Sequence, residues 1–159
     1  MCRVISVSNQ KGGVAKSSCA LNLGIGLVRE GKKVLLIDMD PQGSLTASMG
    51  YSEPDEIPFT IADIIMAIIN EEEIDPSDGI LHHEENVDLM PGNIELFGLE
   101  ITLGNVMRRE MMVEILKPFR EIPVTHRSTW LLMFILTSLM MIVDEMPKCL
   151  KTHFMERRI

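Results

Sequence analysis

The sequence is poor in aromatic residues and cysteines and rich in negative charge, and each imbalance excludes something. Aromatic residues make up only 4% of the 159 residues, so a core must be built from aliphatic side chains and the 13 methionines. Three widely spaced cysteines make neither a zinc pattern nor an even set for disulfides, which favours a reducing, cytoplasmic location. A formal net charge of −8 gives no overall attraction for nucleic acid, so DNA contact would need a local basic patch.

The chain also lacks a signal peptide pattern and a hydrophobic run of full membrane-spanning length. It opens directly on a β-rich run at residues 3–8. The longest apolar run, WLLMFILTSLMMIV at 130–143, is short for a membrane span and contains Thr137 and Ser138. We therefore predict a buried strand or helix there and no membrane association, with a membrane segment as the alternative.

The first forty residues predict the order strand, glycine turn, helix and strand. Residues 15–31 place apolar side chains on one helical face and stop at Gly31. Residues 33–38 form a continuous apolar run, as expected for a strand covered on both faces. A parallel β-α-β unit is the simplest solution, with a right-handed crossover.

The remaining pattern extends this to an α/β fold with a mostly parallel β-sheet flanked by helices. We expect a loop and weak helix at 39–50, a surface loop at 51–60, a helix at 60–74, a strand and turn at 87–97, and one or two helices at 94–119. At 46% apolar residues and this length, the chain is sufficient for one domain with a real core.

The stretch VSNQKGGVAKSSCALN, between the first strand and the first helix, has the composition of a phosphate-binding loop. Binding a phosphate chain needs inward-pointing N–H groups, a helix N-terminus and a mobile cation, while glycines let the backbone approach closely. Lys16 stands where a P-loop lysine reaches the outer phosphates, and Ser17 where a hydroxyl holds Mg²⁺. The general P-loop pattern has glycines at the positions of Gln10 and Ala15, so the plain motif is not met.

That departure has a family signature. KGGVAKSS followed by VLLIDMDPQG resembles the deviant Walker-A ATPases of the ParA/MinD family, whose patterns are K-G-G-x-G-K-[ST]-[ST] and D-x-D-P-Q. The resemblance covers about residues 1–121, which we expect to be the N-terminal part of a nucleotide-binding domain, with an atypical tail at 122–159. It implies a P-loop NTPase-like fold, ATP and Mg²⁺ as ligands, and a role in chromosome or plasmid partitioning.

The resemblance also assigns residues and partners. It implies catalytic roles for Lys11, Lys16 and Asp40 and Mg²⁺ ligation by Ser17 and Asp40. The implied nucleotide-binding residues are Gly12, Gly13, Val14, Ala15, Lys16, Ser17 and Ser18. Two lysines on one phosphate chain suit a transfer in which one charge is supplied by a partner subunit, which predicts a homodimer on ATP binding. A ParB-like activator and non-specific DNA are further implied partners.

Ala15 occupies a position that is usually glycine in this family. If it must adopt a positive φ, its methyl group costs on the order of 1 kcal/mol. We expect this to weaken nucleotide binding without abolishing it.

The tail departs from the family. No D-x-P-P-S motif follows residue 121, and the family's later strands and adenine-contacting region are absent. Three explanations compete. We favour a truncated or rearranged gene product. The alternatives are a genuine short variant, or a displaced strand at 139–145 with Asp144 in the Mg²⁺ role. Without the third motif, a non-catalytic nucleotide-binding fragment or dimerisation module is the alternative to an ATPase.

Other interpretations of these residues remain. The two lysines could be solvated around a turn, and Asp38 could cap a strand or hold a ribose in a Rossmann fold, although G-x-G-x-x-G is missing. His82 and His83 beside Glu84 and Glu85 suggest a polar surface turn more than a metal site. A MinD-like cell-division ATPase would need a terminal basic amphipathic helix, and KCLKTHFMERRI is a poor one.

Overall fold

The computed structural model describes residues 2–7, 9, 11–73, 75–103 and 139–144. The strands are β1 (Cys2–Ser6), β2 (Val34–Asp38), β3 (Leu81–His82), β4 (Asp88–Met90) and β5 (Leu139–Asp144). The α-helices are α1 (Lys16–Arg29), α2 (Ser44–Ser48), α3 (Ile61–Ile69) and α4 (Glu95–Leu103), with 3₁₀ turns at Pro54–Glu56 and Pro76–Gly79. These elements agree with the predicted order, except that the two-residue β3 was not predicted.

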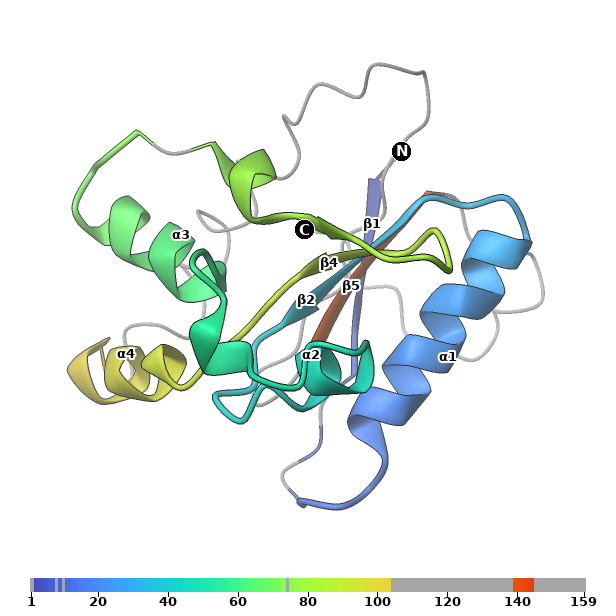
Figure 1. Cartoon of the computed structure of the whole chain (residues 1–159), viewed down its shortest axis with the longest axis horizontal. Coiled ribbons are helices and arrows are strands. Elements are labelled where there is room, and N and C mark those ends of the chain that lie inside the picture. Colours follow the sequence, from blue (N-terminus) through green and yellow to red (C-terminus); the bar gives the residue numbers. More distant parts are fainter. Residues whose placement is uncertain (1, 8, 10, 74, 104–138, 145–159) are drawn as a thin grey trace.

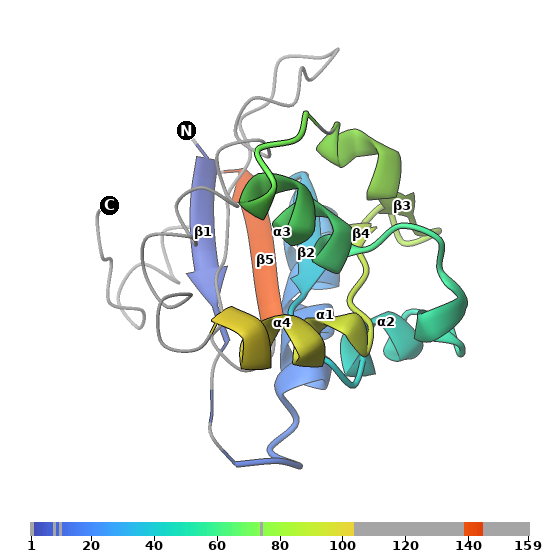
Figure 2. The same ribbon diagram turned by 90° about the vertical axis from the view of Figure 1, so that its left-hand side faces the viewer.

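The strands form one mixed sheet in the order β1-β5-β2-β4-β3. β5 is antiparallel to both β1 and β2, so β1 and β2 run in the same direction, and β4 is parallel to β2. The carboxyl ends of β1, β2 and β4 therefore lie at one edge of the sheet, which we call the carboxyl edge. Figures 1 and 2 show α1 on one face of the sheet, and α3 and α4 on the other.

β2 forms the centre of the core. All five of its residues are buried, as the continuous apolar run predicted. On one face, Gly24 of α1 lies so close to β2 that an added Cβ would meet Leu36 Cδ2 at 3.3 Å. On the other, α3 contributes the fully buried side chains Ile61, Ile64 and Ile65. Covering on both faces is what a strand without polar alternation requires.

α3 begins where its sequence provides a complete cap. The Thr60 side chain accepts from Ala62 N, and the Asp63 carboxylate accepts from Thr60 N at 2.7 Å, which together make a capping box. The helix ends at Ile69, short of the predicted residue 74, and Glu71 takes a positive φ of 57°. Of the helices predicted at 94–119, the structure describes α4, and the remainder lies outside the described residues.

β5 corrects one expectation. The strand exists at 139–144, but its antiparallel register pairs Asp144 with Cys2 at the start of β1, whereas Leu139 pairs with Asp38 at the carboxyl edge. Asp144 therefore lies at the opposite edge from the phosphate loop. A Walker-B-like role in Mg²⁺ binding at Ser17, considered from the sequence, is wrong for this arrangement.

Candidate phosphate-binding site

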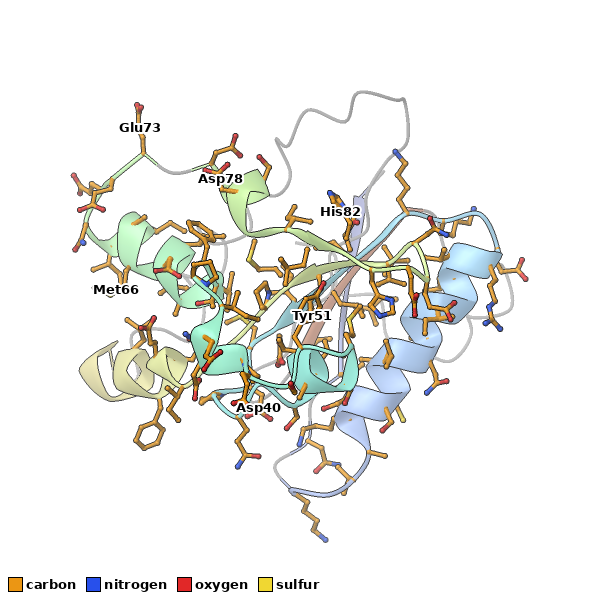
Figure 3. The ribbon with its side chains drawn as sticks, in the orientation of Figure 1. Asp40, Tyr51, Met66, Glu73, Asp78 and His82 are labelled. Carbon is orange, nitrogen blue, oxygen red and sulfur yellow. The ribbon has the colours of Figure 1, made fainter. Side chains whose placement is uncertain are left out.

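The predicted phosphate-binding residues lie in the loop between β1 and α1, at the carboxyl edge of the sheet. Lys11 and Gly12 to Ala15 are exposed, and Lys16 and Ser17, in the first turn of α1, are half-buried. The loop after β2, which carries Asp40, emerges at the same edge because β1 and β2 run in the same direction. Figure 3 shows Asp40 at this end of the molecule, beside α2.

Two residues of the loop adopt the left-handed backbone conformation. Gly13 has a φ of 70°, and Ala15, at the N-cap of α1, has φ 59° and ψ 31°. From the sequence we expected a cost if Ala15 adopts a positive φ, and the structure shows that it does. The methyl group of Ala15 in this conformation costs on the order of 1 kcal/mol.

The backbone of the loop is open to an approaching ligand. A Cβ added to Gly12 or Gly13 would meet nothing within 4 Å. Lys16 Nζ folds back over the loop and donates to the backbone carbonyl oxygen of Lys11 at 3.2 Å. The Lys16 ammonium group, which would bind the phosphates, therefore already lies beside the phosphate loop.

The N-terminus of α1 has no built-in anion. Ala15 at the N-cap offers no side-chain acceptor, and the first turn contains no acidic residue. The first amides of a helix have no intrahelical partner and carry the positive end of the helix dipole. This loop therefore suits a phosphate chain, because it combines exposed glycine backbone, the Lys16 ammonium group and an uncapped helix N-terminus. The residues present fit a bound nucleotide phosphate.

Asp40 lies in a tight turn that its own side chain closes. Its Oδ1 accepts from Gln42 N at 3.0 Å, and its backbone carbonyl accepts from Gly43 N at 2.8 Å. The carboxylate is half-buried and keeps lone pairs beyond this one bond. It remains available as a ligand or as an acceptor for water.

Asp38 is a buried structural residue that accepts hydrogen bonds from α2 and the Asp40 turn. Its Oδ2 accepts from Leu45 N, Thr46 N and Thr46 Oγ1 at 3.1, 2.9 and 2.8 Å, and its Oδ1 accepts from Asp40 N at 3.1 Å. Burial raises the pKa of its carboxyl to about 6, although the bonds from Thr46 oppose that shift. Because the side chain is fully buried, it cannot hold a ribose. A carboxylate ending an unbroken apolar strand was the sequence signal for this role.

The histidine pair is remote from this site. His82 on β3 contacts Asp88, the first residue of β4, so it lies toward the opposite end of the sheet from Asp40 (Figure 3). In the neighbouring turn, Glu85 N donates to His83 Nδ1, and the Glu85 carboxylate lies 3.7 Å from Arg29. Within the described residues, no group of three metal-ligating side chains is present, and no helix is long and apolar enough to cross a membrane.

The chain is similar in sequence to known proteins. The AAA domain family matches residues 2–122. The chain is 36% identical over 114 residues to the sporulation initiation inhibitor protein Soj of Bacillus subtilis, covering 72% of this chain and 43% of Soj. It is 38% identical over 108 residues to the chromosome partitioning protein ParA of Caulobacter vibrioides, covering 67% of this chain and 38% of ParA.

A solved structure agrees with the fold. Cobyrinic acid a,c-diamide synthase from Mycobacterium smegmatis, with bound ADP and magnesium, superposes with a TM-score of 0.66 at 35% identity. The match covers 76% of this chain and 47% of that one. The chain thus spans less than half the length of these relatives.

Proposed function

Because the chain belongs to the AAA-domain family of ParA/MinD-like P-loop ATPases, we propose that it binds ATP with Mg²⁺ and hydrolyses it in chromosome or plasmid partitioning. The observation that carries the proposal is the open loop before α1, with Lys16 Nζ folded over it onto the Lys11 carbonyl. A cytoplasmic location, a homodimer formed on ATP and a ParB-like activator belong to the same proposal.

Each loop residue has a role in this function. The backbone amides of Gly12 to Ser18 would hold the phosphates, Lys16 would neutralise their outer oxygens and Ser17 would ligate Mg²⁺. Bound Mg²⁺ supplies charge neutralisation at the phosphates. Asp40 would accept a hydrogen bond from the attacking water or contribute to the metal's surroundings from the neighbouring loop. Non-specific DNA binding is included only as a family trait, since the net charge of −8 does not favour it.

A Lys16→Ala variant tests the binding step. Loss of the ammonium group should weaken ATP binding by about a hundredfold, in the range of a charge-assisted contact to phosphate. Isothermal titration of the full chain with ATP and Mg²⁺ measures it. The matched control is Lys32→Ala, beyond the far end of α1, which should bind like the wild type. Equal affinities in all three proteins would remove the phosphate-loop assignment.

Lys11→Ala tests the dimer. Lys11 is exposed in the single chain, as a side chain reserved for a partner subunit would be. The variant should keep ATP affinity within about threefold of the wild type but lose the dimer formed with a non-hydrolysable ATP analogue, because the charge acts across the interface. Sedimentation velocity with and without the analogue measures this. A dimer that persists in Lys11→Ala would contradict the trans role.

A second function, nucleotide binding without turnover, is favoured by the position of Asp144. β5 lies between β1 and β2, but its register pairs Asp144 with Cys2 at the start of β1, at the opposite end of the strands from the carboxyl edge. Phosphate release separates the two functions: an ATPase releases phosphate in proportion to bound ATP, and a binding module does not. The MinD-like alternative depends on residues 148–159, which lie outside the described residues.

A further inference from the structure

Thr46 is a buried hydroxyl in the middle of the short helix α2. It is fully buried, and a buried hydroxyl is costly unless both its donor and its acceptor are used. Both are used here: Thr46 Oγ1 donates to Asp38 Oδ2 at 2.8 Å and accepts from Gly92 N at 3.2 Å. The second bond reaches the loop after β4, a distant part of the chain.

These bonds continue to Asp40. Asp38 receives Thr46 on Oδ2 and the backbone N–H of Asp40 on Oδ1. A continuous path therefore runs from the Gly92 amide through the Thr46 hydroxyl and the Asp38 carboxylate to the Asp40 backbone. Hydrogen bonds in such a chain polarise one another, so the loss of one member weakens the others.

Close packing reinforces the path at its far end. A Cβ on Gly92 would overlap the backbone carbonyl oxygen of Asp38, so the loop after β4 is pressed against the end of β2. The same loop is fixed to α3, because Ile61 N donates to the carbonyl of Pro91 at 2.9 Å. The Thr46 hydroxyl thus joins the Asp40 turn to the loop after β4, which is itself bonded to the start of α3.

We propose that Thr46 is a positioning residue for ATP hydrolysis. Its hydroxyl links the Gly92 amide to the Asp38 carboxylate, which in turn holds the Asp40 turn. The proposal rests on the function assigned to Asp40 above. Thr46 does not touch the nucleotide; it sets where the Asp40 turn stands. Its loss therefore changes turnover and the mobility of that turn, and leaves ATP affinity unchanged.

Thr46→Val tests this, because valine keeps the shape and removes the hydroxyl. Thr46→Ser restores the hydroxyl, and Ile64→Val shortens a fully buried side chain of α3 outside the path, as a control for general destabilisation. Amide hydrogen exchange followed by NMR reports the turn directly. Exchange at Asp40 and Gly92 should quicken by about tenfold or more in Thr46→Val and stay within about threefold of the wild type in Thr46→Ser and Ile64→Val.

Kinetics give the second measurement. In Thr46→Val, kcat for phosphate release should fall by about tenfold to a hundredfold while the Kd for ATP stays within about twofold, since misplacement affects the reacting geometry. Unchanged exchange at Asp40 in Thr46→Val would overturn the proposal, as would an equal change in Ile64→Val. Should Thr46→Val fail to fold, a wild-type Gly92 amide that exchanges as fast as a solvated loop amide would also overturn it.

The outcomes separate this proposal from the proposed function. A wild-type chain that binds no ATP would remove the function, and the exchange experiment would still decide whether Thr46 holds the Asp40 turn. A chain that binds and hydrolyses ATP with identical exchange in Thr46→Val and wild type would retain the function and remove the role of Thr46.

Discussion

Two loops meet at the carboxyl edge of the sheet, and they are built in opposite ways. The loop before α1 is exposed from Lys11 to Ala15. The loop after β2 is held by the buried carboxylate of Asp38 and closed by packing against Gly92. The difference suits two tasks: one loop stays open so that its amides can receive a ligand, and the other is fixed so that Asp40 keeps its place.

Gly92→Ala should break the fixed loop with the largest effect. The methyl group would overlap the carbonyl oxygen of Asp38, and the backbone on both sides is buried, so the free energy of unfolding should fall by about 4 kcal/mol or more. Gly12→Ala is the matched control in the open loop, where a Cβ meets nothing, and should cost less than about 1 kcal/mol. Urea denaturation of both variants measures the contrast. Similar losses in the two would show that the loops do not differ in packing.

The Asp38 carboxyl should make stability depend on pH. Its pKa is raised from 3.8 to about 6, so the folded state holds the proton more tightly than the unfolded state does. The contribution is complete below about pH 4 and is lost as pH rises to about 6, a decrease on the order of 2–3 kcal/mol. The difference in unfolding free energy between wild type and Asp38→Asn isolates this group from other carboxyls. A difference that stays flat from pH 4 to pH 6.5 would contradict the shift.

Ala15→Gly should give the smallest effect, a gain. Glycine relieves the left-handed strain at φ 59°, and its greater freedom in the unfolded chain offsets part of this, so stability should rise by less than about 1 kcal/mol. Relief of this strain should leave ATP affinity within about threefold of the wild type. Thermal unfolding and ATP titration measure the two quantities. A large rise in affinity without added stability would place the strain in the bound state instead.

The fold was predictable where the residues of a single segment show its secondary structure directly. The apolar run 33–38 and the face of residues 15–31 identified β2 and α1 because burial on both faces and helical periodicity appear directly in the residues. The direction of β5 was not predictable, since an apolar run ending in Asp144 reads the same for either orientation in the sheet. β3 was missed because two residues are too few to show alternation.

The site was predictable in its parts but not in its connections. The lysines and glycines of the loop follow from the motif, and their meeting with the Asp40 loop at one edge follows from two strands of the same direction. The bond from Gly92 to Thr46 joins residues that share no pattern in the sequence. The sequence left Asp38 open to interpretation as a strand cap or a ribose ligand. Its burial depends on contacts with α2 and the loop after β4, and no sequence pattern shows that these segments meet at Asp38.

The placement of β5 also bears on how the chain folds. β5 lies between β1 and β2, so the sheet pairs two strands, β1 and β5, that lie far apart in the sequence. Within the described residues, β1 pairs with β5 alone, and β2, β4 and β3 can assemble first without either. Closing so long a loop is slow, so formation of the β1–β5 ladder should limit the rate of refolding.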